Sequence, residues 1–364
     1  MEERGEHRKL MTHLEQLMCS IGEICDCGII NDTVNRRYFT GMKSSDGTLV
    51  VFKDKAYLII DFRYIEKARA TAKGCDVILQ DRLYHQINEL IKKHNVKTAA
   101  VNTEFCTVEQ FTAMKSALKV GLSSDNAFTK LIRKIRMVKT QSEIDLMIQA
   151  QRIAEKGFEH MLDFVRAGKT EREVQLELDY YMLKNGAEEL SFDTIALSGK
   201  NTSLPHGVPS DKPIKQGDFV LLDFGAVVQG YHSDMTRTFC VGEPTDKMRK
   251  VYGIVLNAQL AALGAVKAGM TGKELDAVAR DIISKEGYGE NFGHSLGHGV
   301  GMEIHEMPYA SPSKEDILPE NSIVTVEPGI YLEGEFGVRI EDFVVVKNGG
   351  CENMTKAEKQ LIII

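Results

Sequence analysis

One pattern occurs twice in the second part of the chain and limits the folds open to it. Residues 167–174 (AGKTEREV) align with residues 268–275 (AGMTGKEL). Each copy follows a long amphipathic stretch, and in the first of these, 142–168, apolar residues recur at helical spacing. Thr170 and Glu173 have the spacing of a capping box, in which each side chain binds a free backbone amide of the other. The repeat therefore predicts two similar pairs of helices.

The repeat continues into apolar strands that each end in an acid. The sequence DFVLLDFG resembles SIVTVEPG, so that Asp223 corresponds to Glu327. A second strand follows in each half and brings another acid, Asp234 in the first half and Glu341 in the second. Two copies are too few for a solenoid, whose stacked repeats number at least three. We therefore expect an α/β domain of two related halves, with helix pairs outside and strand pairs inside.

The first third of the chain has the pattern of a smaller α/β unit. Residues 48–52 and 56–61 are apolar and β-rich, and the short turn between them indicates a hairpin. Helix-like and strand-like segments then alternate over residues 64–72, 83–94, 98–101 and 108–118. This alternation predicts a sheet covered by helices.

Two domains are the expectation for a chain of 364 residues, which exceeds the usual size of a single hydrophobic core. The small and polar segment 121–126 (GLSSDN) is typical of a joint between domains. We place the boundary at residue 125. This gives an N-terminal domain over residues 1–125 and a larger domain over residues 126–364.

Composition and charge narrow the class of protein. The formal charge of −7 argues against a nucleic-acid surface, which needs clustered Lys and Arg, and the basic run 130–139 is interleaved with apolar residues. Seven scattered cysteines do not form a disulfide framework, which favours the reducing cytoplasm. The charged N-terminus is no secretory signal, and no run of about 18 apolar residues predicts a membrane span.

The four acids of the repeat would all be costly to bury as charged carboxylates. An acid at the end of an apolar strand is costly to bury unless it is paired or bound to a metal. Taken singly, Asp223 or Glu327 would more often be a strand-end cap or an ion-pair partner. Four acids at equivalent positions would repel one another, and cations between them are the usual relief. The repeat therefore points to a metal site.

A segment rich in glycine and histidine, 292–306 (FGHSLGHGVGMEIHE), supplies the remaining candidate ligand. His294 and His298 have the spacing of a helical zinc pair, but Ser295 stands where a zinc metallopeptidase of the H-E-x-x-H type has glutamate. The spacing of its glycines is not that of the G-x-G-x-x-G dinucleotide loop. Neither a zincin nor a dinucleotide-binding site is therefore indicated.

One histidine with four carboxylates forms an oxygen-rich set of ligands. Such a set suits Mn²⁺ or a similar octahedral ion better than a thiolate-type zinc site. Bridging carboxylates would hold two ions about 3.5–4 Å apart, which can share a hydroxide of lowered pKa and polarise a carbonyl. The implied reaction is amide hydrolysis.

Four segments resemble a known family. LLDFGAVVQGYHSDMTRTF, FGHSLGHGVGMEIHE, IVTVEPGIYL and GVRIEDFVVV are similar to the Xaa-Pro aminopeptidases and Xaa-Pro dipeptidases (prolidases) of the M24 metallopeptidases. The resemblance implies a pseudo-twofold pita-bread catalytic domain over about residues 126–364, preceded by a smaller α/β domain like that of creatinase and prolidase. In that first domain the clearest matches are 38–41 (YFTG) and 60–64 (IDFRY).

The same resemblance assigns a set of five metal ligands, none of which is missing from this chain: Asp223, Asp234, His298, Glu327 and Glu341. It implies that Asp234 and Glu341 are bidentate or bridging and that Glu327 accepts a proton during the reaction. The metal would be a pair of divalent ions, with Mn²⁺ preferred and Co²⁺ or Zn²⁺ as alternatives.

Four further residues receive roles beside the metals. The resemblance makes His206 a contact to the substrate or leaving group, and makes His294 and His305 substrate-binding or proton-shuttling groups. Their charge could change near pH 7. Arg339 lies two residues before Glu341, so a strand would point both to one face and let Arg339 orient Glu341 or a substrate carboxylate.

The predicted activity is that of an Xaa-Pro aminopeptidase, which hydrolyses the bond between an N-terminal residue and proline. The preference for proline is inherited from the resemblance, and the expected partners are small proline-containing peptides. A dipeptidase restricted to Xaa-Pro is one alternative, and a non-catalytic scaffold with the same fold is another. The resemblance also implies a homodimer in which the N-terminal domain borders the neighbouring active site.

Overall fold

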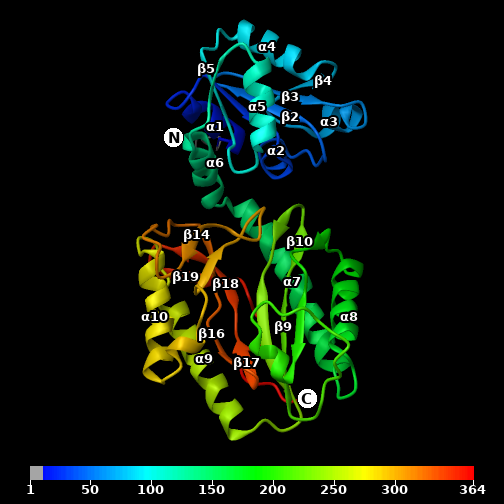
Figure 1. Cartoon of the computed structure of the whole chain (residues 1–364), viewed down its shortest axis with the longest axis vertical. Coiled ribbons are helices and arrows are strands. Elements are labelled where there is room, and N and C mark those ends of the chain that lie inside the picture. The colour runs from blue at the N-terminus through cyan, green and yellow to red at the C-terminus, as the bar shows by residue number, and fades with distance from the viewer. Residues whose placement is uncertain (1–10) are drawn as a thin grey trace, which may run out of the picture. The chain divides into compact units, whose positions relative to one another are not determined.

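The computed structural model describes residues 11–364, and the chain divides into two units between Arg136 and Met137 (Figure 1). This division lies beyond the boundary that we placed at residue 125. Helix α6 (Ala127–Met137) follows the polar segment, and it belongs to the first unit because Phe128 packs against Gly28 there. Arg136 at the end of α6 also donates to Asn35 in that unit. A polar segment therefore precedes this helix without separating the two units.

The first unit is a six-stranded sheet with helices packed on it, in the strand order β4-β3-β2-β1-β5-β6 (Figure 1). Its strands are β1 (Cys27–Ile30), β2 (Thr48–Phe52), β3 (Ala56–Ile60), β4 (Asp76–Leu79), β5 (Thr98–Val101) and β6 (Gly121–Ser123). Its other helices are α1 (His13–Ile21), α2 (Thr33–Thr40), α3 (Ile65–Thr71), α4 (Leu83–Lys93) and α5 (Val108–Ala117). The predicted hairpin is confirmed, because β2 and β3 pair antiparallel. Both strands are buried along their whole length, as their continuous apolar sequences require.

In the second unit, two pairs of helices flank the strands, as the repeat predicts (Figure 1). They are α7 (Gln141–Phe164) with α8 (Glu171–Lys184), and α9 (Asp246–Ala265) with α10 (Gly272–Lys285). The predicted capping box is present at the start of α8, where Thr170 and Glu173 bond to each other's backbone amides at 2.8 and 3.1 Å. Thr271 and Glu274 form the equivalent box at the start of α10. The two helix pairs therefore begin with the same local device.

Antiparallel strand pairs lie between the helix pairs. In the first half β9 (Asp218–Phe224) pairs with β12 (Met235–Val241) and with the edge strand β8 (Ile195–Ser198). In the second half β15 (Ile323–Val326) pairs with β18 (Asp342–Lys347), which also pairs with β19 (Gly350–Asn353). The shorter elements are β7 (Glu189–Leu190), η1 (Gly199–Ser203), β10 (Ala226–Val228), β11 (Tyr231–His232), η2 (Gly289–Asn291), β13 (Gly297–Gly299), β14 (Glu306–Ala310), β16 (Gly329–Leu332) and β17 (Phe336–Arg339).

Each half of the second unit has its own hydrophobic core. Apolar residues of α7 and α8 pack on β9 and β12, and those of α9 and α10 pack on β15 to β18. The halves meet at their strands, where the Glu341 amide donates to the Thr236 carbonyl at 3.1 Å. A buried ion pair between Arg237 and Asp342 crosses the same junction at 2.8 Å. This pseudo-twofold arrangement of helix pairs around strand pairs is the pita-bread architecture.

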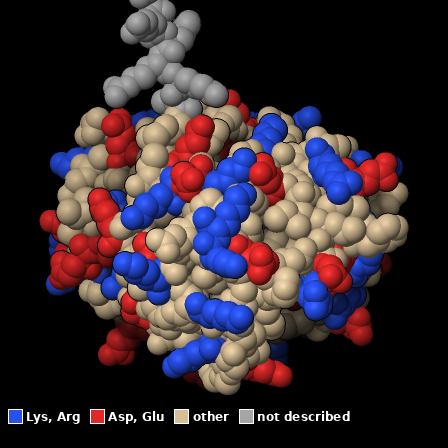
Figure 2. All heavy atoms as spheres, turned by 90° about the horizontal axis from the view of Figure 1, so that it is seen from above, with Lys and Arg blue, Asp and Glu red and all other residues tan. Residues whose placement is uncertain are grey.

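The surface carries charges of both signs. On the face seen in Figure 2, Lys and Arg side chains are interspersed with Asp and Glu. Among the described residues, no helix has the length and apolar character that crossing a membrane requires.

Candidate metal centre

The four acids of the repeat lie at the ends of the central strands. Asp223 is the penultimate residue of β9, and Asp234 immediately precedes β12. Glu327 immediately follows β15, and Glu341 immediately precedes β18. The two strand pairs therefore each deliver two carboxylates to one place in the fold.

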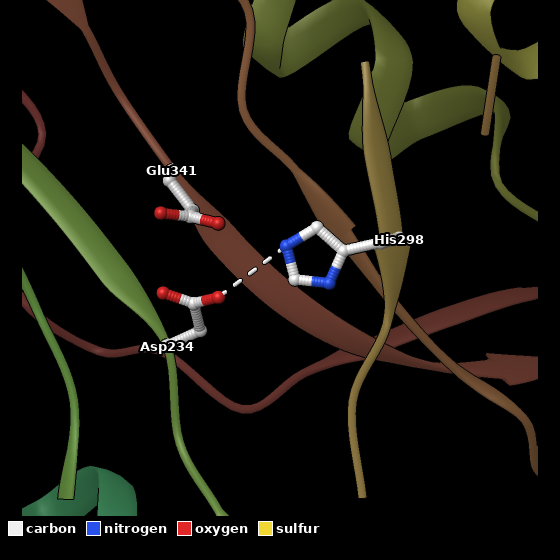
Figure 3. Close-up of side chains that lie close together, drawn as sticks. All are labelled: Asp234, His298 and Glu341. Atoms are coloured by element: carbon white, nitrogen blue, oxygen red, sulfur yellow. Dashed lines mark ion pairs between the residues drawn. The ribbon is translucent and has the colours of Figure 1, made fainter. Parts of the chain in front are cut away.

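His298 on β13 completes the cluster. Ligand atoms of Asp234, His298 and Glu341 all lie within 4.8 Å of one another, and their side chains point toward a common centre (Figure 3). The His298 Nε2 atom is 3.5 Å from oxygens of both Asp234 and Glu327. Atoms that bind one ion at about 2.1 Å are separated by about 3–4 Å from each other. The two 3.5 Å separations at His298 therefore fit a coordination sphere.

Asp223 carries an independent sign that a cation fits here. Its Oδ2 atom accepts a hydrogen bond from Arg339 at 2.6 Å. Its Oδ1 atom is buried and accepts no hydrogen bond from any described residue. A buried carboxylate oxygen without a partner is costly, whereas a metal ion satisfies it without a hydrogen bond.

Burial and mutual repulsion disturb the protonation of the acids. Burial, followed by the charges of Asp223 and Glu327, raises the pKa of Asp234. Burial, followed by the charges of neighbouring acids, raises the pKa of Glu341 well above its ordinary value. Burial also raises the pKa of Glu327 to about 8. Without a cation, burial favours the protonated form of these carboxyl groups, and a divalent ion would displace the protons.

His298 is arranged as a neutral ligand. Burial, followed by the nearby His305, lowers the pKa of His298 to about 3. Its Nδ1 atom lies 3.1 Å from the Gly299 carbonyl, which fixes the proton on Nδ1. The lone pair of Nε2 therefore faces the carboxylates, as in histidines that bind metals.

Two threonines orient the carboxylates. Thr236 donates to Glu341 Oε2 at 2.8 Å, and Thr325 donates to Glu327 Oε1 at 3.4 Å. Each threonine lies two residues from an acid, Thr236 from Asp234 and Thr325 from Glu327, so that strand alternation could have suggested a shared face. Sequence reasoning missed both, because threonine is common in strands.

The guanidinium of Arg339 is fully engaged. It donates to Asp223 at 2.6 Å, to the Tyr331 hydroxyl at 2.7 Å and to the Thr236 hydroxyl at 3.0 Å. It reaches Glu341 only through Thr236, which donates to that acid. We had expected Arg339 to orient Glu341 or a substrate carboxylate, whereas its direct carboxylate partner in the structure is Asp223.

His294 lies at the end of a hydrogen-bonded chain. Its Nδ1 atom is 2.8 Å from the Ser295 carbonyl, which leaves Nε2 to accept from the Tyr331 hydroxyl at 2.9 Å. Burial, followed by the positive charge of Arg339, lowers the pKa of His294 to about 4. Tyr331, which links the two, was also missed because nothing in GIYL distinguishes it from a core aromatic residue.

The metal centre opens into a cavity of about 820 Å³. All nine residues for which the sequence predicts a role line this cavity: His206, Asp223, Asp234, His294, His298, His305, Glu327, Arg339 and Glu341. The ring of His305 lies 4.3 Å from that of His298. Burial, followed by the charge of His206, lowers the pKa of His305. The structure therefore brings every predicted side chain to one cavity.

Helix α10 supports the loop that carries His294 and His298. The buried Asp276 holds Arg280 through two hydrogen bonds of 2.6 and 2.9 Å, and it also accepts the Leu296 amide at 2.9 Å. Arg280 in turn donates to the carbonyls of Phe292 and His294, both at 2.8 Å. The helix thus fixes the backbone on both sides of His294.

Comparison with known proteins agrees with this geometry. Residues 145–348 match metallopeptidase family M24, and residues 11–138 match the creatinase/prolidase N-terminal domain. An Xaa-Pro dipeptidase from Pyrococcus furiosus is 41% identical over 90% of this chain and 93% of its own length. The structure of an Xaa-Pro dipeptidase from Bacillus anthracis has a TM-score of 0.93 and 42% identity, covering 97% of this chain and 99% of that one. An X-Pro aminopeptidase from Thermotoga maritima has a TM-score of 0.87 and 38% identity, covering 93% and 98%.

Each of the two units thus matches a domain that is found in metallopeptidases. The oxygen-rich cluster is compatible with the divalent metal ions that family M24 uses. The chain belongs to metallopeptidase family M24 and carries the N-terminal domain found in creatinase and prolidase.

Proposed function

We propose that this chain is a dinuclear-metal exopeptidase that hydrolyses the bond between an N-terminal residue and proline, an Xaa-Pro aminopeptidase. The observation that carries the proposal is the convergence of four carboxylates and one neutral histidine in the lining of one cavity, which is large enough for a peptide. Similar proteins named Xaa-Pro dipeptidase and X-Pro aminopeptidase support proline as the second residue.

The proposed ligands are Asp223, Asp234, His298, Glu327 and Glu341. Their hard oxygen donors favour two Mn²⁺ ions, with Co²⁺ or Zn²⁺ as alternatives. When bound, such a pair supplies a water of lowered pKa and polarises the scissile carbonyl. The Oδ1 atom of Asp223 is buried and accepts no hydrogen bond from the described residues. This unsatisfied acceptor is the feature of the structure that most favours a bound cation.

The chain's own side chains would move the protons and orient the peptide. Glu327 is the proton acceptor, because burial already raises its affinity for a proton and Thr325 holds one of its oxygens. His206 and His305 are exposed within the cavity, where they can stabilise the developing oxyanion and assist departure of the proline nitrogen. The chain from Arg339 through Tyr331 to His294 would keep His294 neutral and fixed.

The preference for longer peptides over dipeptides rests on the size of the cavity. Its volume of about 820 Å³ lies in the upper part of the range for small-molecule sites, roughly 300–1,000 Å³. A dipeptide would fill only part of it. A dipeptidase restricted to Xaa-Pro is the second candidate, and it is favoured by the names of similar proteins from Pyrococcus furiosus and Bacillus anthracis.

The test is hydrolysis of a proline dipeptide and of a proline-containing tripeptide, measured side by side with Mn²⁺. Turnover of both supports the aminopeptidase, and turnover of the dipeptide alone supports the prolidase. Metal analysis of the purified protein separates either enzyme from a non-catalytic scaffold. A protein that holds no Mn, Co, Zn or Fe and gains no activity with Mn²⁺ would favour the scaffold.

The proposal includes a homodimer in the cytoplasm. Free thiols at all seven cysteines fit a reducing compartment. Leu176, Tyr180 and Leu183 form an exposed apolar row on α8, which is the kind of surface that a subunit contact covers. Light scattering after gel filtration would distinguish a dimer from a monomer of 40.6 kDa.

A further inference from the structure

We propose that Arg172 forms a subsite that binds the C-terminal carboxylate of substrates longer than a dipeptide. The inference rests on the proposed function and extends it to the part of the peptide that follows proline. Arg172 is the second residue of α8, and it lines the same cavity as the metal centre. Arg172 is neither a proposed metal ligand nor a proposed catalytic residue.

The cavity lining offers little positive charge for a peptide's carboxylate. Its two guanidinium side chains, among the described residues, are Arg339 and Arg172. Arg339 is already bound to Asp223 and Tyr331 and is only 3% exposed. Arg172 is exposed, and its side chain donates only to the neutral amide oxygen of Gln175, at 3.0 Å. Arg172 therefore has donors left for a carboxylate, and a guanidinium stays charged at any relevant pH.

The order of the strands places Arg172 beyond the metal centre. The sheet runs β12-β9-β8, and Ile195 on the edge strand β8 pairs with Asp223 on β9. Ile195, Thr194 and Gln175 continue the cavity lining on that side, toward Arg172 on α8. Neighbouring strands are about 4.8 Å apart, and an extended peptide advances about 3.4 Å per residue. The carboxylate of a dipeptide would thus stay beside β9, whereas that of a tripeptide or tetrapeptide would cross β8.

The base of Arg172 is held in place, although its side chain is exposed. Its backbone amide donates to the Ser210 carbonyl at 3.0 Å. The preceding residue, Glu171, is buried and accepts hydrogen bonds from Ser198, Asn201 and Ser210. These bonds tie the start of α8 to segments on both sides of His206, so that the guanidinium is presented to the cavity from a fixed backbone.

An acid on the same side does not neutralise Arg172. Asp193 also lines this part of the cavity and is exposed. The two side chains form no ion pair in the structure, where the hydrogen bond to Gln175 is the contact that Arg172 makes through its side chain. The guanidinium of Arg172 therefore lies beside the neutral amide of Gln175 and keeps its charge available for a terminal carboxylate.

The experiment compares two forms of one proline-containing tripeptide, one with a free C-terminal carboxylate and one with a C-terminal amide. The readout is the ratio of kcat/KM for the acid to kcat/KM for the amide, measured with the Mn²⁺-loaded full chain. The variants are R172A, R172K and the control R166A, which removes an exposed arginine outside the cavity lining. R166A changes the net charge as R172A does, so it reports long-range electrostatics alone.

R172A is expected to lower this ratio roughly three- to ten-fold, the range for a charge-assisted hydrogen bond at an exposed site. R172K should give an intermediate ratio, because it keeps the charge and loses the two-pronged geometry. R166A should keep the wild-type ratio. Equal ratios in R172A, R166A and wild type would overturn the inference while the proposed function stands. Failure of the wild type to hydrolyse any Xaa-Pro peptide would overturn both.

Discussion

Asp223 has two carboxylate oxygens in unlike surroundings. One accepts a hydrogen bond from Arg339, and the other is buried without a hydrogen bond. Arginine would orient the carboxylate, and the second oxygen would then face the metals. The proposed role of Asp223 thus requires an oxygen on both sides of the side chain. Asparagine has only one side-chain oxygen and cannot fill this role.

Conversion of Asp223 to Asn is therefore expected to abolish hydrolysis without unfolding the protein. The amide can still accept from Arg339, but its NH₂ group would face the metals and cannot bind them. We expect kcat/KM to fall by at least about a hundred-fold, and bound Mn²⁺ to fall with it. The measurements are peptide hydrolysis, metal content and thermal unfolding, with exposed Asp281→Asn as the matched control. Full activity in the Asn variant would remove Asp223 from the ligand set.

The raised pKa of Glu327 predicts how stability depends on pH. Burial raises this pKa from 4.5 to about 8 in the metal-free protein. The folded state thus binds the proton more tightly than the unfolded chain. The contribution of Glu327 to stability is therefore fully present below about pH 4.5 and is lost as pH rises through 8. A divalent ion replaces that proton, and metal binding therefore stabilises the protein more at high pH.

We expect added Mn²⁺ to raise Tm more at about pH 8 than at about pH 5.5. Calorimetry with Mn²⁺ and with a chelator, at both pH values, measures the difference. Glu327→Gln is the matched variant, because it keeps the shape of the side chain and removes the titrating group. The same Mn²⁺ effect at both pH values would contradict the linkage of metal and proton binding.

At the scale of elements, helix α10 positions the loop that carries two of the histidines. Asp276 and Arg280 lie one turn apart on this helix and together bind the backbone at Phe292, His294 and Leu296. Asp276 is only 1% exposed, so loss of its partner would leave a buried charge. The helix thus acts on the metal centre through the backbone of the loop.

Arg280→Ala is expected to weaken Mn²⁺ binding about ten- to a hundred-fold, the usual effect of losing a group that orients ligands. It should also lower the free energy of unfolding by roughly 3–5 kcal/mol, because Asp276 remains buried without its partner. Arg249→Ala is the control, since that arginine forms only an exposed ion pair with Glu243. Calorimetric Mn²⁺ titration and denaturant unfolding give both values. Unchanged Mn²⁺ affinity in Arg280→Ala would mean that the loop keeps its conformation without the hydrogen bonds from Arg280.

The capping boxes of α8 and α10 offer a comparison between the two halves. Thr170→Ala and Thr271→Ala each remove the side-chain oxygen that accepts the backbone amide of the glutamate in the box. Each should lower the free energy of unfolding by about 1 kcal/mol, with similar losses because the local geometry is the same. Thr112→Ala is a control, because its hydroxyl bonds only to a carbonyl one turn earlier in α5. Denaturant unfolding that gave a loss in one half alone would contradict the equivalence.

At the scale of the whole molecule, each unit encloses a hydrophobic core of its own. One core joins strands and helices of the first unit, from Cys27 to Leu118. The cores that flank the central strands of the second unit contain only residues of that unit. Every proposed metal ligand also belongs to the second unit.

A fragment of residues 137–364 is therefore expected to fold and bind Mn²⁺ without the first unit. Circular dichroism during heating should show a cooperative transition, and Mn²⁺ should raise its midpoint as it does in the full chain. The same fragment with Asp223→Asn is the control, because it should keep the transition and lose the effect of Mn²⁺. A fragment that shows no cooperative transition would mean that the second unit depends on the first.

Local signals in the sequence were reliable where the structure is decided locally. The hairpin of β2 and β3 and the capping box at Thr170 depend on neighbouring residues, and both are present as predicted. The boundary at residue 125 relied on a polar segment, whereas α6 packs on the first unit through Phe128 and bonds to it through Arg136. That packing is a tertiary contact, which composition alone does not reveal.

The internal repeat determined more than any single motif did. It predicted two helix pairs, two strand pairs and acids at equivalent strand ends, because strand ends of similar halves must come to similar places. The partners of those acids depend instead on the register between strands and on how the loops pack. Only the tertiary structure therefore revealed the bond between Asp223 and Arg339, the role of Tyr331, and the exposed Arg172 beyond β8.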